Sequence, residues 1–217
     1  ASLCKADSIN CYGSEFDVWL STDGVLFVNH DAVFKGHNVE QSSSAELSAI
    51  ILDNGEHMPT LDEYLAKAKT LKTRIVLELK AHQTKEKEAE AVAQIVEMVE
   101  KYGLTDRTEY ISFSLFACKE FKRVAPQGTD IYYLNGELSP AELKTLGFAG
   151  FDYSMGPIKK HPEWIEEAHK LGLKVNVWTI DKEADMQWLI DQKVDFITTL
   201  SLIHISESTR RSYISYA

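Results

Sequence analysis

The feature that most constrains the fold of this chain is a regular alternation of short apolar runs with amphipathic stretches. The apolar runs are rich in β-branched and aromatic residues, which predicts strands, and the stretches between them repeat apolar residues every three or four positions, which predicts helices. Such alternation is typical of parallel strands joined by helical crossovers. The predicted parallel strands are residues 14–20, 74–80, 109–114, 130–135, 150–154, 174–180 and 194–199. The predicted helices are residues 60–70, 85–102, 115–124, 139–146, 161–171 and 182–192.

Seven parallel strands are one short of a (β/α)8 barrel. Residues 1–10 resemble the last turns of a helix with no strand before them. We therefore expect an α/β fold of the TIM-barrel type that lacks its first strand and its last helix. A doubly wound open sheet is the alternative, but that fold would carry a glycine-rich phosphate-binding turn after an early strand, and the sequence has none. Residues 25–30 follow the hairpin signal Asp23-Gly24 and are predicted to form an accessory antiparallel strand.

The two ends of the chain differ in character. Residues 1–199 are expected to form one incomplete barrel domain, with a small insert at about residues 32–58 that caps the site. Residues 200–217 are rich in serine and lack helical periodicity, and their start, LSLIHISESTRR, closely resembles the translation of an adapter used in sequencing libraries. We interpret this tail as non-native and exclude it from the fold. The alternative is a genuine polar extension.

Charge and hydropathy exclude several classes of partner. The formal net charge of −10 argues against binding to nucleic acid or to anionic membrane surfaces, both of which require a basic face. No apolar run approaches the roughly 18 residues that span a bilayer, so stable membrane insertion is not expected. The compartment stays open between the cytoplasm and, if a signal peptide lies upstream of Ala1, the periplasm or the exterior. The oligomeric state is unknown at this stage.

Acidic residues mark the ends of two predicted strands. Glu15 and Asp17 lie two residues apart, so their side chains leave the same face of a strand, and inward-facing carboxylates repel each other unless a cation compensates them. Glu78 stands near the carboxyl end of another strand, where the active sites of such barrels lie. Three carboxylates form an oxygen-only site suited to Ca²⁺ or Mg²⁺. The absence of a Cys or His cluster at ligand spacing argues against zinc.

Three further residues are candidates for the same site. Lys80 shares a strand face with Glu78 and is expected to hold a phosphate oxygen, the alternative being a structural salt bridge to one of the acids. His30 ends the accessory strand and can exchange a proton near neutral pH, although a histidine in this position is more often a surface residue. Trp178 lies in the run VNVWTI and is either a wall of the site or part of the barrel core.

The chain resembles the glycerophosphodiester phosphodiesterase family. The segment GSEFDVWLSTDGVLFVNHD is similar to a family signature with an E-x-D pair, a T-x-D-G turn, an apolar strand and a closing H-D. MPTLDEYL, VLELK, ISFS, VNVWTI and DFITT follow in the family's order, so the resemblance covers residues 1–199.

The resemblance implies a divalent metal held by Glu15, Asp17 and Glu78, with His30 as one of two acid/base histidines. It also implies that Lys80 contacts the phosphate and that Trp178 lines the substrate site. The implied reaction is hydrolysis of a glycerophosphodiester, a small-molecule substrate, to glycerol 3-phosphate and an alcohol.

The sequence departs from the family at one signature. A strand that ends in His-Arg should precede residue 1, and residues 1–13 contain no substitute for it. We therefore expect a truncated enzyme whose activity as a 217-residue chain is weak or absent. Two alternatives stay open: a lysophospholipid or phosphoinositide phosphodiesterase on the same barrel, and a non-catalytic module that binds metal or phosphate.

Overall fold

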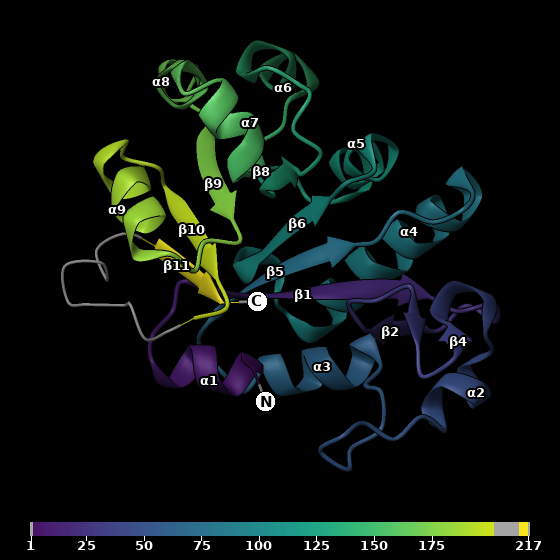
Figure 1. Ribbon diagram of the computed structural model, residues 1–217. Coiled ribbons are helices and arrows are strands. Elements are labelled where there is room, and N and C mark those ends of the chain that lie inside the picture. The colour runs from purple at the N-terminus through teal and green to yellow at the C-terminus, as the bar shows by residue number, and fades with distance from the viewer. Residues whose placement is uncertain (1, 202–212, 217) are drawn as a thin grey trace.

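The computed structural model describes residues 2–201 and 213–216, and these form a curled parallel sheet surrounded by helices (Figure 1). The strands of the main sheet are β1 (Gly13–Leu20), β2 (Leu26–Val28), β5 (Arg74–Leu79), β6 (Thr108–Ser112), β7 (Ile131–Tyr133), β8 (Gly150–Ser154), β9 (Lys174–Trp178), β10 (Phe196–Thr199) and β11 (Tyr213–Tyr216). Their order is β11-β10-β9-β8-β7-β6-β5-β1-β2. All seven expected parallel strands are present, which confirms the α/β class and the barrel-type arrangement.

Helices follow the parallel strands and cover the outer face of the sheet (Figure 1). They are α1 (Ser2–Ser8), α2 (Ser44–Ser48), α3 (Leu61–Ala68), α4 (Lys85–Tyr102), α5 (Leu115–Val124), α6 (Pro140–Leu146), α7 (Met155–Lys160), α8 (Glu163–Lys170) and α9 (Glu183–Asp191). The helix predicted over residues 161–171 is shorter, and α7 precedes it as an additional element. Thr60 begins α3 with a capping box to Glu63, so this helix start follows directly from the local sequence.

The position of the missing strand is occupied. β11 pairs in parallel with β10 and also with β1, so it lies between the two edges that a seven-stranded sheet would expose. The sequence argument gave residues 200–217 no part in the fold, and for residues 213–216 this is wrong, because the unpaired backbone groups of both edges favour any segment that can supply a strand. The expected foreign origin of the tail stays a prediction.

The sheet separates two apolar regions by the alternation of its side chains. Leu77 of β5 and Val175 of β9 point outward and belong to the main core with the helices, where Ile95 of α4 also lies. Val76 and Ile111 point inward and form a second cluster inside the barrel. Because side chains alternate along each strand, the residues at positions 15, 17, 78, 80 and 178 share the inner face with this second cluster.

The accessory strand and the insert form a separate small unit beside β1. β2 pairs antiparallel with β1, as expected, and Gly24 in the turn has the positive φ of 81° that the connection requires. The insert contains β3 (Val33–Phe34), β4 (His37–Asn38), a 3₁₀ turn (Val39–Gln41) and α2. Its apolar residues pack around Trp19 and Phe27 in their own cluster. Because of this packing, the insert lies beside the barrel. It was expected to cap the site, but none of its described residues lines the cavity.

Candidate active site

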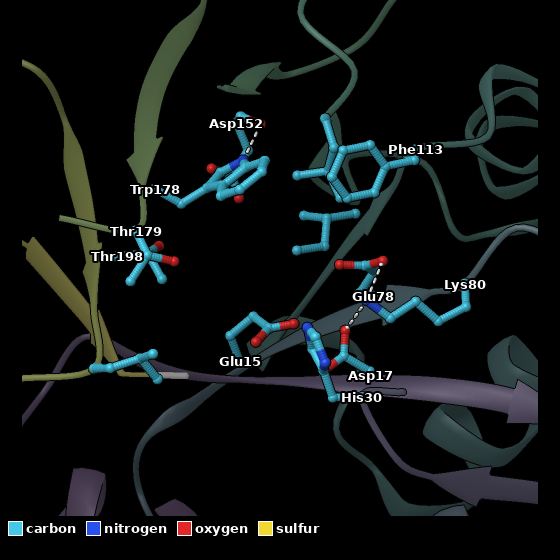
Figure 2. Close-up of a pocket in the computed structure, with 13 residues that line it drawn as sticks. Glu15, Asp17, His30, Glu78, Lys80, Phe113, Asp152, Trp178, Thr179 and Thr198 are labelled. Carbon is cyan, nitrogen blue, oxygen red and sulfur yellow. Dashed lines mark hydrogen bonds and ion pairs between the residues drawn. The ribbon is translucent and has the colours of Figure 1, made fainter. Parts of the chain in front are cut away.

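A cavity of about 250 Å³ opens at the carboxyl ends of the strands (Figure 2). All six residues that the sequence singled out line this cavity: Glu15, Asp17, His30, Glu78, Lys80 and Trp178. The acids and the lysine come from β1 and from β5 with the residue after it, on one side, and Trp178 comes from β9 on the other. The structure therefore brings the candidates together, whereas the role of each one stays a prediction.

Three carboxylates converge at the floor of the cavity. Asp17 and Glu78 are directly opposed in the register of β1 and β5, and each of Glu15, Asp17 and Glu78 offers an oxygen within 4.8 Å of the others. Burial, together with the charges of Asp17 and Glu78, raises the pKa of Glu15 well above its usual range. Burial likewise raises the pKa of Glu78 to about 7, although the nearby Lys80 ammonium opposes the rise. The site is thus short of positive charge.

Lys80 is the cationic side chain that forms salt bridges with these acids among the described residues. Its Nζ lies 2.6 Å from Asp17 Oδ1 and 2.9 Å from Glu78 Oε1. Burial alone would lower the pKa of Lys80, but Glu78 and Asp17 outweigh burial and raise it, so the ammonium stays charged. The salt bridges that the sequence left as an alternative role for Lys80 are therefore present, and within residues 2–201 and 213–216 no salt bridge to Glu15 accompanies them.

The donor set fits a divalent cation. The Glu15 Oε1 atom is buried and has no hydrogen-bond partner among the residues that the structure describes. One ammonium cannot neutralise three carboxylates, and oxygen-only ligands suit a hard ion such as Ca²⁺ or Mg²⁺. Among the His, Cys, Asp and Glu side chains of the described residues, these three are the group whose ligand atoms lie close enough together to hold a metal ion.

A half-buried histidine, His82, fixes the backbone beside Lys80. The Leu20 N–H donates to His82 Nε2 at 2.9 Å, so His82 Nδ1 carries the ring proton and donates to the Lys80 carbonyl oxygen at 2.7 Å. Burial lowers the pKa of His82, which keeps the ring neutral and preserves both bonds. His82 also contacts the Trp19 ring at 5.4 Å between centroids. It therefore ties the end of β1 to the residue that follows β5.

Two buried glutamates hold the loop that continues from this point. Glu88 Oε1 accepts the His82 backbone N–H at 3.1 Å, and its other oxygen accepts from Ser114 Oγ at 2.6 Å. Glu40, from the insert, accepts the Gln83 N–H at 3.0 Å. The insert thus supports the site indirectly, by fixing the loop after β5.

The opposite wall of the cavity is aromatic. Trp178 Nε1 donates to the Asp152 carbonyl oxygen at 2.9 Å, and its ring meets Phe113 edge to face at 5.7 Å between centroids (Figure 2). Trp178 also packs against the inner apolar cluster that contains Leu134. Trp178 therefore both lines the cavity and contacts the inner apolar cluster, and its role toward a substrate stays a prediction.

His30 lies at the rim rather than inside the cavity. β2 ends at Val28, so His30 belongs to the following loop and not to a strand. Its side chain is 78% exposed, and Nδ1 lies 2.8 Å from Asp31 Oδ1. The exposed ring thus lies between solvent and the cavity, and its catalytic role stays a prediction.

The sequence analysis missed Phe113, Asp152 and Thr198, which also line the cavity. Asp152 left a signal, because a charged residue in the middle of the aromatic strand GFDYS has to face the barrel interior. Phe113 and Thr198 left none, since apolar and small residues at strand ends are usual in any barrel.

Fold and site together define a barrel protein with an acid-lined site at the carboxyl ends of its strands, the position of catalytic sites in enzymes of this architecture. The model of the Glycerophosphoryl diester phosphodiesterase family matches residues 12–199. A glycerophosphodiester phosphodiesterase from Caldanaerobacter subterraneus subsp. tengcongensis is 25% identical, over 92% of this chain and 86% of that protein.

Solved structures agree with this assignment. A glycerophosphodiester phosphodiesterase from Parabacteroides distasonis superposes with a TM-score of 0.91 at 46% identity, covering 97% of this chain and 87% of the other. A phosphodiesterase from Oleispira antarctica, solved with its product sn-glycerol-3-phosphate, has a TM-score of 0.77 at 24% identity and covers 91% of this chain and 84% of the other. The chain belongs to the glycerophosphoryl diester phosphodiesterase family, whose members hydrolyse phosphoric diesters and depend in general on divalent cations. No helix within the described residues is long and apolar enough to cross a bilayer.

Proposed function

We propose that this chain hydrolyses glycerophosphodiesters to glycerol 3-phosphate and an alcohol with the help of Ca²⁺ or Mg²⁺. The observation that carries the proposal is the convergence of three carboxylates with one ammonium in a cavity at the carboxyl ends of the strands. The product bound to the Oleispira antarctica relative supports the choice of substrate.

Glu15, Asp17 and Glu78 are proposed to hold the cation, because their oxygens converge and a buried oxygen of Glu15 has no partner in the described part of the chain. The cation, when bound, supplies positive charge that offsets the charge on the phosphodiester. Lys80, which pairs with Asp17 and Glu78 in the structure, would then be able to pair with a phosphate oxygen as a point charge.

His30 is proposed to carry a proton between the substrate and solvent. Its exposed ring borders the cavity, and Asp31 can orient it through Nδ1 and leave Nε2 for the reacting group. Trp178 and Phe113 are proposed to form the apolar wall against which the carbon skeleton of the substrate lies. Water is thereby excluded from one side of the phosphate.

The proposal is tested by release of glycerol 3-phosphate from glycerophosphocholine, measured with a coupled dehydrogenase while Ca²⁺ or Mg²⁺ is titrated. Glu78→Gln is expected to abolish the cation-dependent signal. Glu109→Gln serves as the matched control, because Glu109 is equally buried in the barrel but bonds to Tyr12 and Arg74 away from the cavity. Cation-independent turnover by the unaltered chain would contradict the proposal.

The number of proton carriers is tested separately. The family resemblance places a second histidine on a strand before β1, and residues 1–13 contain no histidine. A polypeptide of residues 1–217 is therefore expected to turn over at least about a hundredfold more slowly than one extended by a strand ending in His-Arg, since a positioned acid or base contributes roughly 10²–10⁴-fold. Equal rates for the two polypeptides would show that His30 suffices.

A further inference from the structure

One buried acid that lines the cavity lies outside the carboxylate cluster. Asp152 is on the inner face of β8, is 3% exposed and contributes to the cavity wall. Its Oδ1 atom is buried and has no hydrogen-bond partner among the described residues. Asp152 does not belong to the trio of acids whose oxygens converge. Asp152 Oδ1 is therefore open to a hydrogen bond that the described residues do not supply.

The side chain is oriented by two neighbouring strands. Asp152 is opposite Asn176 of β9 in the sheet register, and a hydrogen bond from the Asn176 side chain acts on its carboxyl group. Asn176 Nδ2 in turn donates to Thr198 Oγ1 of β10 at 3.0 Å. Asp152 and Thr198 both border the cavity, so β8, β9 and β10 present a short polar row on the wall that also carries Trp178 (Figure 2).

The chemistry of this row selects one kind of occupant. A buried carboxyl oxygen without a donor costs free energy, and such a cost is offset where a ligand supplies the missing hydrogen bond. Burial raises the pKa of Asp152 to about 8, so near neutral pH the group both donates and accepts. A hydroxyl also does both, whereas a phosphate oxygen only accepts and an ammonium only donates.

We propose that Asp152, oriented by Asn176 and Thr198, binds a hydroxyl group of the glycerol moiety and makes the site selective for phosphodiesters that carry free glycerol hydroxyls. This inference rests on the proposed function, because it assumes that a glycerol phosphate occupies the cavity. It adds a specificity residue on the wall opposite the carboxylate trio.

The test compares two ligands that differ only in hydroxyl groups. The binding of sn-glycerol 3-phosphate and of n-propyl phosphate is measured by isothermal titration calorimetry, in Ca²⁺ and separately in Mg²⁺. The unaltered chain is expected to prefer glycerol 3-phosphate by at least about tenfold, since sites built to bond a hydroxyl reject analogues without it. In Asp152→Leu this preference is expected to fall below about twofold while the affinity for n-propyl phosphate is retained. Asp152→Ala is the second variant and removes the carboxyl group without adding volume.

A stability measurement separates ligand binding from a structural role. Asp152→Leu removes an unpaired buried oxygen but also the acceptor of the Asn176 side chain, so the two effects on the Tm of the ligand-free protein are expected to offset each other to within about 4 °C, whereas loss of a structural residue would lower Tm by more. Glu109→Gln is the control, and its preference for glycerol 3-phosphate should match that of the unaltered chain.

Each other outcome has a definite meaning. A full preference in Asp152→Leu and Asp152→Ala would overturn the inference, as would equal binding of the two ligands by the unaltered chain, although the phosphate site of the proposed function would survive both results. Failure of the unaltered chain to bind either ligand would instead contradict the proposed function.

Discussion

Replacement of Glu15 by glutamine separates the two energetic consequences of the carboxylate trio. Glu15 is half-buried, its buried Oε1 has no hydrogen-bond partner among the described residues, and Asp17 and Glu78 repel its charge. Gln has nearly the same shape, carries no charge and can donate to the neighbouring carboxylates. We therefore expect Glu15→Gln to stabilise the metal-free protein and to weaken its response to a divalent cation.

The magnitudes follow from the burial of the site. An unsatisfied buried polar group costs about 1–3 kcal/mol, and for a chain of this size each 1 kcal/mol shifts Tm by about 2–4 °C. Glu15→Gln should thus raise the metal-free Tm by roughly 2–12 °C at pH 8. A cation at a hundred times its Kd adds about 2.7 kcal/mol to the unaltered protein, or roughly 5–10 °C, and we expect less than about 2 °C in the variant.

The assay is thermal unfolding in EDTA and then in excess Ca²⁺ or Mg²⁺, followed by the fluorescence of the tryptophans. Glu109→Gln is the control, because Glu109 already accepts from Tyr12 and from Arg74 Nε at 3.1 Å. This control should lower the metal-free Tm and leave the shift on cation addition intact. A Glu15→Gln protein that keeps the full cation shift would refute the assignment of Glu15 as a ligand.

Three further predictions follow from other parts of the structure. The free energy of unfolding of the metal-free protein should fall as the pH rises from about 4 to about 8. The folded state keeps the Asp152 proton up to its raised pKa of about 8, whereas the unfolded chain releases it near the usual pKa of an aspartate. This difference lowers the free energy of unfolding by up to about 1.4 kcal/mol per pH unit. Urea unfolding at pH 5 and pH 8 measures this, and an unchanged slope in Asp152→Asn would count against it. His82→Leu should lower Tm and weaken phosphate binding, because it orphans the Leu20 N–H at a cost of about 1–3 kcal/mol and releases the Lys80 backbone; tight phosphate binding by a folded variant would argue otherwise. A chain that ends at Thr199 should melt lower than the 217-residue chain, since it loses the pairing of β11 with β10 and β1; identical melting would favour a tail with no part in the fold.

The sequence determined the features that depend on local periodicity. Side chains alternate along a strand, so the two-residue spacing of Glu15 and Asp17, and that of Glu78 and Lys80, placed each pair on one face before any contact was known. The same periodicity gave the seven parallel strands and the α/β class. These predictions needed only neighbours along the chain.

The tertiary structure decided everything that depends on residues far apart in sequence. The register of β1 against β5 set Asp17 opposite Glu78 and brought Lys80 into contact with both. The pairing of β8 with β9 set Asp152 opposite Asn176 and left its Oδ1 buried without a hydrogen-bond partner among the described residues, which no local pattern could reveal.

The pairing at the two edges of the sheet was likewise decided by the tertiary structure. No property of residues 213–216 by themselves indicated that they would pair with both β10 and β1. Strand pairing satisfies backbone groups with little regard for side chains, so a segment can complete a barrel without carrying a recognisable signature of its place in it. The sequence therefore determined which faces the functional residues occupy, and only the closure of the barrel decided which of them meet.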